Sequence, residues 1–294
     1  MQSLQVAFLG LGVMGAPMAG HLAAAGHRVR VYNRTRSKAE QWLTRHRGEI
    51  AATPREAAQG ADIVFSMVSD DPDVRAVALG EHGAFDVMRP DSVFVDHSTT
   101  SAELARELAA EARRRGFHFL DAPVTGGQAG AENGTLTIMV GGDEAVYERV
   151  RPVLAAYAKA STWMGPSGAG QLTKMVNQIC VVGLLQALAE GIDFGLRAGL
   201  DMKRVLELLS QGAAGSWQMQ HRGPTMVEGR FDFGFAVDLM RKDLRICMEE
   251  ASRNGAELAV TRLVDRFFAD VQAMGGGRWD TSSLICRLRG KPRT

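Results

Sequence analysis

The first half of the chain alternates short apolar runs with helix-like segments. Apolar runs that predict buried strands occur at residues 6–9, 29–32, 63–68, 93–96, 118–121 and 136–140. Helix-like segments lie between them, among others at residues 16–25, 37–45, 73–78 and 101–115. Strands that alternate with helices in this way predict a parallel sheet covered on both faces.

The alternation ends at a cluster of breaker residues, Gly-Pro-Ser-Gly-Ala-Gly at 165–170. The helix expected after it, at about residues 171–198, has apolar residues mostly three and four apart, which predicts one broad buried face. These residues are Leu172, Met175, Val176, Ile179, Val182, Leu185 and Leu188. Further helices are expected at about 202–210, 236–254 and 260–274. We therefore predict a sheet domain at residues 1–165 and a helical domain at residues 166–294.

The strand expected at residues 6–9 leads into Gly-Leu-Gly-Val-Met-Gly at 10–15. Between a strand and a helix, with a second strand following, this pattern is typical of a dinucleotide-binding β-α-β unit. Gly10 permits the tight turn, Gly12 lets the backbone approach a pyrophosphate, and Gly15 allows close packing of helix on strand. A glycine turn without a ligand is the alternative. We predict an α/β Rossmann-type N-terminal domain with a mostly parallel sheet, joined by a long helix to an all-α C-terminal domain.

The second strand ends in Asn33-Arg34-Thr35. This is roughly 20 residues past the first glycine, where an acidic residue would hold the ribose of NAD. An arginine beside a hydroxyl instead suits the 2′-phosphate of NADP, because the guanidinium offers a planar cationic fork. Arg34 as an ordinary exposed residue at a strand end is the alternative. We favour NADP(H) as the cofactor, with NAD(H) as the second choice.

The charge balance is close to neutral, with 34 Lys plus Arg against 33 Asp plus Glu. We therefore expect neither nucleic acid nor a membrane surface as a partner. The apolar run at 179–189 is interrupted by Gln186 and is expected to fall short of a membrane span. Cys180 within it is expected to be buried. The seven histidines show no metal-ligand spacing, so no metal is expected.

The N-terminal residues, the cysteines and the long apolar helix bear on cellular location and assembly. Met1 leads almost directly into a core strand, which leaves no room for a signal peptide. The three scattered cysteines suit a reducing compartment. We therefore expect a cytoplasmic protein, and the long apolar helix favours a homodimer or homotetramer.

Several longer motifs occur in order along the chain. They are Phe8 to Gly15, Asp96-His97-Ser98-Thr99, Asp121-Ala122-Pro123-Val124-Thr125-Gly126-Gly127, Gly168 to Asn177, and Arg241-Lys242-Asp243-Leu244. Together they make essentially the whole chain similar to the β-hydroxyacid dehydrogenase family, which includes 3-hydroxyisobutyrate dehydrogenase, tartronate semialdehyde reductase and glyoxylate/succinic semialdehyde reductases. Two departures stand out. Thr125 replaces a frequent serine, and a proline usual after the Ser-Thr pair is missing at Ser101-Ala102.

The resemblance implies a role for each matching position. Lys174 would be the catalytic acid/base and Asn177 a substrate-orienting side chain. The glycine loop, the strand ends and the resemblance together give the expected cofactor contacts: Gly10, Leu11, Gly12, Val13, Met14, Gly15, Asn33, Arg34, Thr35, Met67, Val68, Thr99 and Lys242. The expected substrate contacts are Thr125, Gly126, Gly127, Lys174, Asn177, Phe235 and Asp243.

Elementary chemistry supports the two catalytic positions. Lys174 and Asn177 are three residues apart at the start of a helix, so they share one face. Carbonyl reduction needs a proton donor at oxygen, and a partly desolvated lysine can have its pKa lowered toward the working pH. A solvated helix lysine is the alternative, which the neighbouring Gly170 and apolar residues disfavour. The consecutive glycines 126–127 offer backbone N–H groups to a carboxylate.

The predicted function is hydride transfer between NADP(H) and a small carboxylate-bearing aldehyde or 3-hydroxyacid. Glyoxylate and the succinic, tartronate and methylmalonate semialdehydes all fit. An imine reductase is one alternative, although such enzymes generally lack a lysine at the position of Lys174. A catalytically silent NADP-binding module is another, and the intact lysine, asparagine and glycine pair argue against it.

Overall fold

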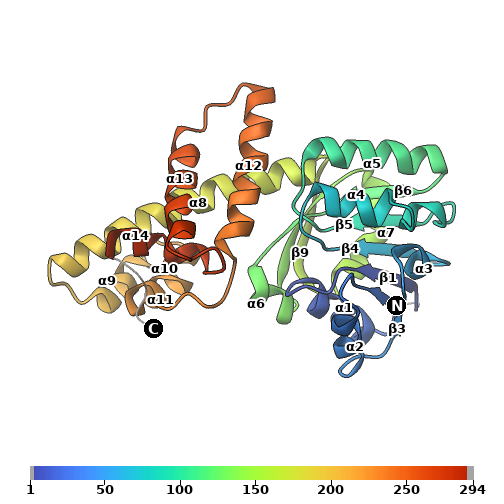
Figure 1. Ribbon diagram of the computed structural model, residues 1–294, viewed down its shortest axis with the longest axis horizontal. Helices are drawn as coiled ribbons and strands as arrows, with labels where there is room; N and C mark the ends of the chain where they lie inside the picture. The colour runs from blue at the N-terminus through green and yellow to red at the C-terminus, as the bar shows by residue number, and fades with distance from the viewer. Residues whose placement is uncertain (1–2, 290–294) are drawn as a thin grey trace. The chain divides into compact units, whose positions relative to one another are not determined.

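The chain forms a sheet-based part and a helical part. The computed structural model describes residues 3–289. Its contacts divide the chain into two compact units, Met1–Lys174 and Met175–Thr294. The first contains every strand of the described chain, and the second is helical (Figure 1). The predicted fold class, a Rossmann-type domain followed by an all-α domain with a long helix between them, is confirmed.

One nine-stranded sheet organises the first unit. Its strands are β1 (Gln5–Leu9), β2 (Arg28–Tyr32), β3 (Glu49–Ile50), β4 (Ile63–Ser66), β5 (Val93–Asp96), β6 (His118–Asp121), β7 (Val124–Thr125), β8 (Leu136–Gly141) and β9 (Ala158–Gly165). The order is β3-β2-β1-β4-β5-β6-β8-β7, with β9 on β8. The first six strands run parallel, whereas β8 is antiparallel to β6 and β7. Their order, 3-2-1-4-5-6, is that of doubly wound dinucleotide-binding sheets.

Both faces of the sheet are covered, because successive side chains of a strand point to opposite sides. Val6 and Phe8 of β1 belong to one apolar cluster, while Ala7 and Leu9 belong to the other. The first cluster lies under α1 (Gly15–Ala24), α2 (Arg36–Leu43), α6 (Gly127–Glu132) and α7 (Glu144–Leu154). The second lies under α3 (Pro54–Ala58), α4 (Asp71–Leu79), the 3-10 helix η1 (Ala84–Asp86) and α5 (Ala102–Arg115).

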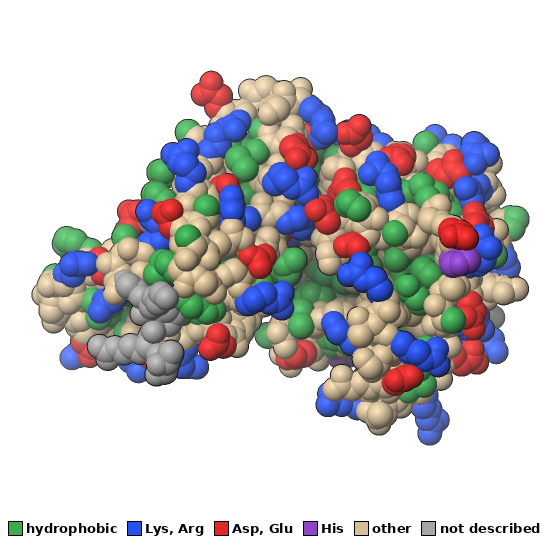
Figure 2. Space-filling model, viewed as in Figure 1, with side chains coloured by type: hydrophobic (Ala, Val, Ile, Leu, Met, Phe, Trp, Pro, Cys, Tyr) green, Lys and Arg blue, Asp and Glu red, His purple; other side chains and the backbone are tan. Residues whose placement is uncertain are grey.

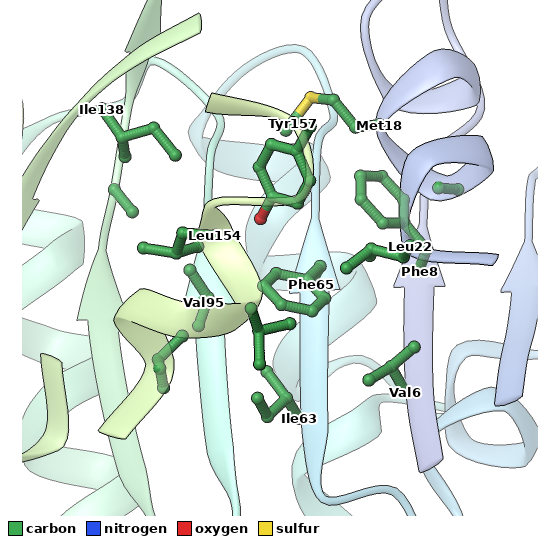
Figure 3. Packing of buried hydrophobic residues seen from close by; sticks show 14 of the residues in the cluster. Val6, Phe8, Met18, Leu22, Ile63, Phe65, Val95, Ile138, Leu154 and Tyr157 are labelled. Atoms are coloured by element: carbon green, nitrogen blue, oxygen red, sulfur yellow. The ribbon is translucent and has the colours of Figure 1, made fainter. Parts of the chain in front are cut away.

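A buried histidine and tyrosine stiffen the first cluster. Tyr157 packs among Phe65, Met18 and Leu154 (Figure 3). His97 Nδ1 lies 2.6 Å from the carbonyl oxygen of Ala122 and must donate to it, so Nε2 accepts from the Tyr157 hydroxyl at 2.9 Å. Burial lowers the pKa of His97 to about 4, so the ring is neutral at physiological pH. His97 therefore connects the chain just beyond β5 to Ala122, just beyond β6, and to Tyr157, just before β9.

The second unit consists of helices. They are most of α8 (Ala169–Arg197), α9 (Met202–Leu209), α10 (Trp217–His221), α11 (Gly223–Glu228), α12 (Val237–Asn254), α13 (Ala259–Ala273), the 3-10 helix η2 (Thr281–Ile285) and α14 (Cys286–Arg289). The four predicted long helices end within a few residues of their expected bounds. The strands β3, β7 and β9 and the helices α3, α6, α7, α10 and α11 were not among the predicted elements.

Helix α8 is more exposed than its pattern suggested. Met175, Val182, Leu185 and Leu188 are buried as expected, but Val176 is 61% exposed. Cys180 is also exposed, so its predicted burial was wrong. The reason is geometric: apolar residues surround this helix too widely for one neighbouring layer to cover them all.

The expectation that this helix falls short of a membrane span was wrong on length and composition. Over 29 residues α8 is long and apolar enough to cross a membrane, because its apolar character extends well beyond residues 179–189. A core helix of a soluble protein passes the same test, so the finding is weak evidence of a membrane. Figure 2 shows acidic and basic side chains interspersed over the visible face of each unit.

Candidate cofactor and active site

The glycine loop lies where the sheet changes winding direction, between β1 and β4. Gly10 has φ +101°, and a Cβ there would lie 2.3 Å from the Met67 carbonyl oxygen. At Gly15 a Cβ would lie 2.0 Å from the Gly10 oxygen. At Gly12, by contrast, a Cβ would meet no heavy atom within 4 Å. The loop is thus closed at both ends and open in the middle, at the start of α1, which suits a pyrophosphate against bare backbone.

Asn33 shapes this loop. Its Oδ1 accepts a hydrogen bond from the Leu11 N–H at 2.8 Å, and its Nδ2 donates to the Thr35 oxygen at 2.9 Å. The Leu11 N–H therefore already has a hydrogen-bond partner within the protein, and the Leu11 side chain is buried in the core. These two expected cofactor residues hold the loop and the end of β2 together. The sequence motif could not reveal this bond.

Arg34 is one of the exposed residues among the expected cofactor contacts. Its side chain is 86% exposed, and its guanidinium lies 3.3 Å from Asp73. An exposed ion pair of this kind contributes little energy, so it leaves the side chain available for another anion. Thr35 precedes α2 without capping it through its side chain. Both residues lie at the carboxyl end of β2, on the same sheet edge as the glycine loop.

The neighbouring strand ends complete this edge. Met67 and Val68 follow β4 and are partly buried, and the Val68 N–H donates to Ser98 Oγ at 2.9 Å. Thr99, after β5, is likewise partly buried. In the glycine loop, Val13 is largely exposed and Met14 is the residue before α1. The structure therefore brings the expected cofactor residues of the first unit to one edge.

The expected carboxylate site is a turn that contains two consecutive glycines. Thr125 ends β7 and pairs with Thr137 of β8. The next two residues, Gly126 and Gly127, have φ +126° and +61°, values that favour glycine. A Cβ on Gly127 would meet no heavy atom within 4 Å. The turn thus presents unobstructed backbone, as an anion site requires.

Two carboxylates that sequence reasoning left without a role are buried beside these strand ends. Asp96 and Asp121 are register partners on β5 and β6. Asp96 Oδ1 accepts from Ser66 Oγ at 2.7 Å and from the Ser98 N–H at 3.1 Å. Burial raises the pKa of each carboxyl to about 6, against the opposing effect of these hydrogen bonds.

Asp96→Asn should therefore stabilise the protein at neutral pH. The asparagine amide oxygen can still accept hydrogen bonds, and the variant removes the buried charge. For a pKa raised from 3.8 to about 6, that charge costs about 3 kcal/mol of stability at pH 7.5. A raised pKa means that wild-type stability is fullest below pH 3.8 and is lost as pH rises through 6. The advantage of the variant should thus grow by about 1 kcal/mol between pH 5 and pH 7.5.

Urea unfolding at the two pH values measures this difference. Asp232→Asn, at an exposed position, serves as the control and should change the free energy of unfolding by less than about 0.5 kcal/mol at either pH. An Asp96→Asn effect that is equal at both pH values would contradict the assignment.

Lys174 is buried in the second turn of α8. Three residues earlier, Gln171 donates through Nε2 to the Ser98 oxygen at 2.7 Å and accepts at Oε1 from the Thr100 N–H at 3.1 Å. The start of this helix is therefore bonded to the chain on both sides of Thr99. Lys174 thus belongs to a helix anchored at the sheet edge that carries the glycine loop.

The helical unit holds the remaining expected residues in a hydrogen-bonded chain. Asn177 Nδ2 donates to Gln178 Oε1 at 2.7 Å, and Gln178 Nε2 donates to Asp243 Oδ2 at 2.6 Å. Lys242 Nζ lies 2.8 Å from Asp243 Oδ1, as an ion pair without hydrogen-bond alignment. Asp243 is only 1% exposed. It therefore orients Asn177 through Gln178, a residue that the sequence pattern did not single out.

The aromatic segment expected near the substrate is organised by another buried carboxylate. Phe235 is partly buried against the helical core, and its N–H donates to Asp280 Oδ2 at 2.9 Å. Asp280 pairs at 3.2 Å with Arg222, whose guanidinium lies 5.0 Å from the ring centres of both Trp217 and Phe233. Much of the Phe235 environment is thus core packing.

Comparison with known proteins agrees with this arrangement. Residues 5–165 match the family model described as the NAD binding domain of 6-phosphogluconate dehydrogenase. Residues 168–288 match the one described as NAD-binding of NADP-dependent 3-hydroxyisobutyrate dehydrogenase. Within residues 3–289, no group of three or more His, Cys, Asp or Glu side chains is arranged so that it could hold a metal ion.

Full-length relatives extend the match. An uncharacterized oxidoreductase of Shewanella frigidimarina (strain NCIMB 400) is 58% identical, covering 97% of this chain and 98% of its own. The 2-hydroxy-3-oxopropionate reductase of Escherichia coli (strain K12) is 37% identical, covering 97% of each chain. The structure of Mycobacterium tuberculosis 3-hydroxyisobutyrate dehydrogenase with L-serine superposes with a TM-score of 0.89 at 32% identity, covering 98% of this chain and 100% of that one.

The fold and these matches place the chain in a class of oxidoreductases whose members act on CH–OH groups, and the matched domains indicate a nicotinamide cofactor. Within that class the chain belongs to the β-hydroxyacid dehydrogenase family.

Proposed function

We propose that this protein is an NADP(H)-dependent reductase of small carboxylate-bearing aldehydes, working in reverse as a 3-hydroxyacid dehydrogenase. The observation that carries the proposal is Lys174, a buried lysine on a helix bonded to the cofactor edge of the sheet. Two relatives named for 3-hydroxyisobutyrate and 2-hydroxy-3-oxopropionate support a small acid as substrate. Glyoxylate and the succinic, tartronate and methylmalonate semialdehydes belong to this substrate class.

The residues of this chain divide the remaining work. The nicotinamide, when bound, supplies or accepts the hydride. Lys174 donates the proton to the carbonyl oxygen, so that the aldehyde becomes an alcohol, and it takes the proton back in the oxidative direction. The backbone N–H groups of Gly126 and Gly127 bind the substrate carboxylate. Asn177, held by Gln178, orients the substrate.

Arg34 supports NADP(H) over NAD(H). It stands at the end of β2, where NAD-specific sheets carry an acidic residue, and its neighbour Asn33 is committed to the glycine loop. Its guanidinium is exposed and can pair with a 2′-phosphate. The family model matching residues 168–288, described as NADP-dependent, points the same way.

Arg34→Ser should weaken NADPH binding by about 10- to 100-fold, because a charge-assisted hydrogen bond to the 2′-phosphate is lost. NADH binding, which involves no such phosphate, should change by less than about threefold. Fluorescence titration with both cofactors measures the difference. Arg28→Ser, at the opposite end of β2, is the matched control. Equal losses for NADPH and NADH in the Arg34 variant would refute the role.

A substrate panel with NADPH and NADH in parallel tests the proposed activity. It should include glyoxylate, the three semialdehydes, butanal as an uncharged analogue of succinic semialdehyde, and a cyclic imine. We expect turnover of at least one carboxylate-bearing aldehyde, faster with NADPH, and much slower turnover of butanal. Reduction of the imine with no turnover of any acid would replace the proposal with an imine reductase, and cofactor binding without any turnover would indicate a silent module.

A further inference from the structure

The N-terminus of α8 is seated on a buried carboxylate. Asp121, at the end of β6, accepts from the Gly168 N–H at 2.8 Å through Oδ1 and from the Gln171 N–H at 3.0 Å through Oδ2. The side chain is fully buried. The first N–H groups of a helix have no partner within the helix, and the helix dipole favours negative charge at that end. Asp121 therefore fixes the position of the first turn.

Two glycines allow α8 to approach Asp121 closely. A Cβ on Gly170 would lie 2.6 Å from the Asp121 carbonyl oxygen and 2.9 Å from its Oδ2. A Cβ on Gly141 of β8 would lie 2.5 Å from Asp121 Oδ1 and 2.7 Å from the Gly170 nitrogen. The helix can approach the strand ends this closely only because both residues lack side chains. Little room is left for the first turn to slide or rotate.

Gln171 adds a second connection from the same turn. Its side chain is completely buried, and it bonds the Ser98 oxygen and the Thr100 N–H, which flank Thr99. An amide is suited to this position because it offers a donor and an acceptor together. Gln171 therefore fixes the position of the segment after β5 along the axis of α8.

Lys174 lies three residues further along α8. This places it about 4.5 Å along the axis from Gln171 and on the same face. A shift of the first turn would therefore move the lysine relative to Thr99 by a similar amount. Proton donation requires such groups to be placed within a fraction of an ångström.

We propose that Asp121 and Gln171 are positioning residues, which hold Lys174 in register with the cofactor edge of the sheet at Thr99. The inference rests on the proposed function of Lys174 and extends it. A purely structural anchor is a poor explanation, because an apolar contact would hold the helix without burying a charge. Burial raises the pKa of Asp121 to about 6, which shows that the carboxylate is costly to keep here.

Gln171→Met is the decisive variant, since it preserves volume and removes both side-chain hydrogen bonds. We expect kcat to fall about 10- to 100-fold, with KM for the aldehyde and Kd for NADPH changed less than about threefold. The deuterium isotope effect with NADPH labelled at the transferred C4 hydrogen should increase, because hydride transfer becomes rate-limiting. In the protein without cofactor, hydrogen exchange should show a faster-exchanging Thr100 amide.

Gln186→Met is the matched control on the same helix. Gln186 is also buried, at 7% exposure, but it donates to Glu190 and lies about 18 Å along the helix from Lys174. It should lose comparable stability and keep wild-type kcat and isotope effect. Asp121→Asn, which keeps the shape and one acceptor oxygen, provides a second variant with the same expected kinetic pattern if Gln171→Met does not fold.

The outcomes separate the two hypotheses. Wild-type kcat and isotope effect in a folded Gln171→Met, despite faster exchange at Thr100, would overturn the positioning role. A Lys174→Met variant that retains full activity would overturn the proposed role of Lys174 as proton donor, and with it the positioning role of Asp121 and Gln171, whereas the absence of any aldehyde turnover in the wild-type protein would overturn the proposed function. A slow Lys174→Met with a fully active Gln171→Met would leave the function standing and reject only the positioning.

Discussion

Lys174→Met should lower kcat for aldehyde reduction by about 10²- to 10⁴-fold, the range that a positioned proton donor contributes. Methionine keeps most of the length and apolar volume of the lysine stem, so the buried position should tolerate it. The loss should appear in kcat more than in KM, because the proton is transferred only as the carbonyl is reduced. NADPH affinity should stay within about threefold of wild type.

Steady-state kinetics and cofactor titration on the same preparation test this prediction. Lys203→Met, at an exposed position on α9 where the lysine pairs with Glu228, is the control and should keep wild-type kcat. If the Lys174 variant turned over every competent aldehyde at the wild-type rate while binding NADPH, another group would have to supply the proton. A variant that lost NADPH binding as well would instead show that Lys174 supports the cofactor edge.

The succession of strands along the chain and the position of the glycine loop after the first strand were predictable, because both depend on local patterns. Alternate residues of β1 belong to different apolar clusters, because the strand is buried on both faces of the sheet. A strand buried on both faces appears in the sequence as a continuous apolar run. Gly15 is required by a backbone contact within a single β-α unit, because a Cβ there would lie 2.0 Å from the Gly10 oxygen. Gly10 is required by its φ of +101° and by the Met67 carbonyl oxygen, which follows β4. The two-residue strand β3 had no such signal, because it is too short and too exposed to form an apolar run.

The side-chain partners within the site were not predictable, because spacing says nothing about which polar atoms meet. Asn33 was expected to contact the cofactor, and in the structure its side chain accepts a hydrogen bond from the Leu11 N–H of the glycine loop. Asp243 was expected to contact the substrate, yet both of its oxygens face protein partners. Gln178 had no motif of its own, although it links Asn177 to that carboxylate.

Gly12→Ala should weaken dinucleotide binding by about tenfold or more without lowering stability. A methyl group at residue 12 meets no protein atom within 4 Å, so the fold can accept it. The same open space is where a pyrophosphate would approach the backbone, and the methyl group would hold it away. Loss of one charge-assisted hydrogen bond from the loop corresponds to about 1.5–3 kcal/mol, or roughly 10- to 100-fold in affinity.

Two further glycine variants make this test specific. Gly191→Ala, on α8, also meets no heavy atom within 4 Å and should leave both stability and NADPH affinity near wild type. Gly15→Ala would place its methyl group 2.0 Å from the Gly10 oxygen and should lower the melting temperature strongly. Thermal unfolding and NADPH titration of all three variants therefore distinguish a ligand-facing glycine from a packing glycine. Unchanged NADPH affinity in Gly12→Ala would show that the pyrophosphate does not bind at this loop. It would thereby refute the assignment of this sheet edge as the cofactor site.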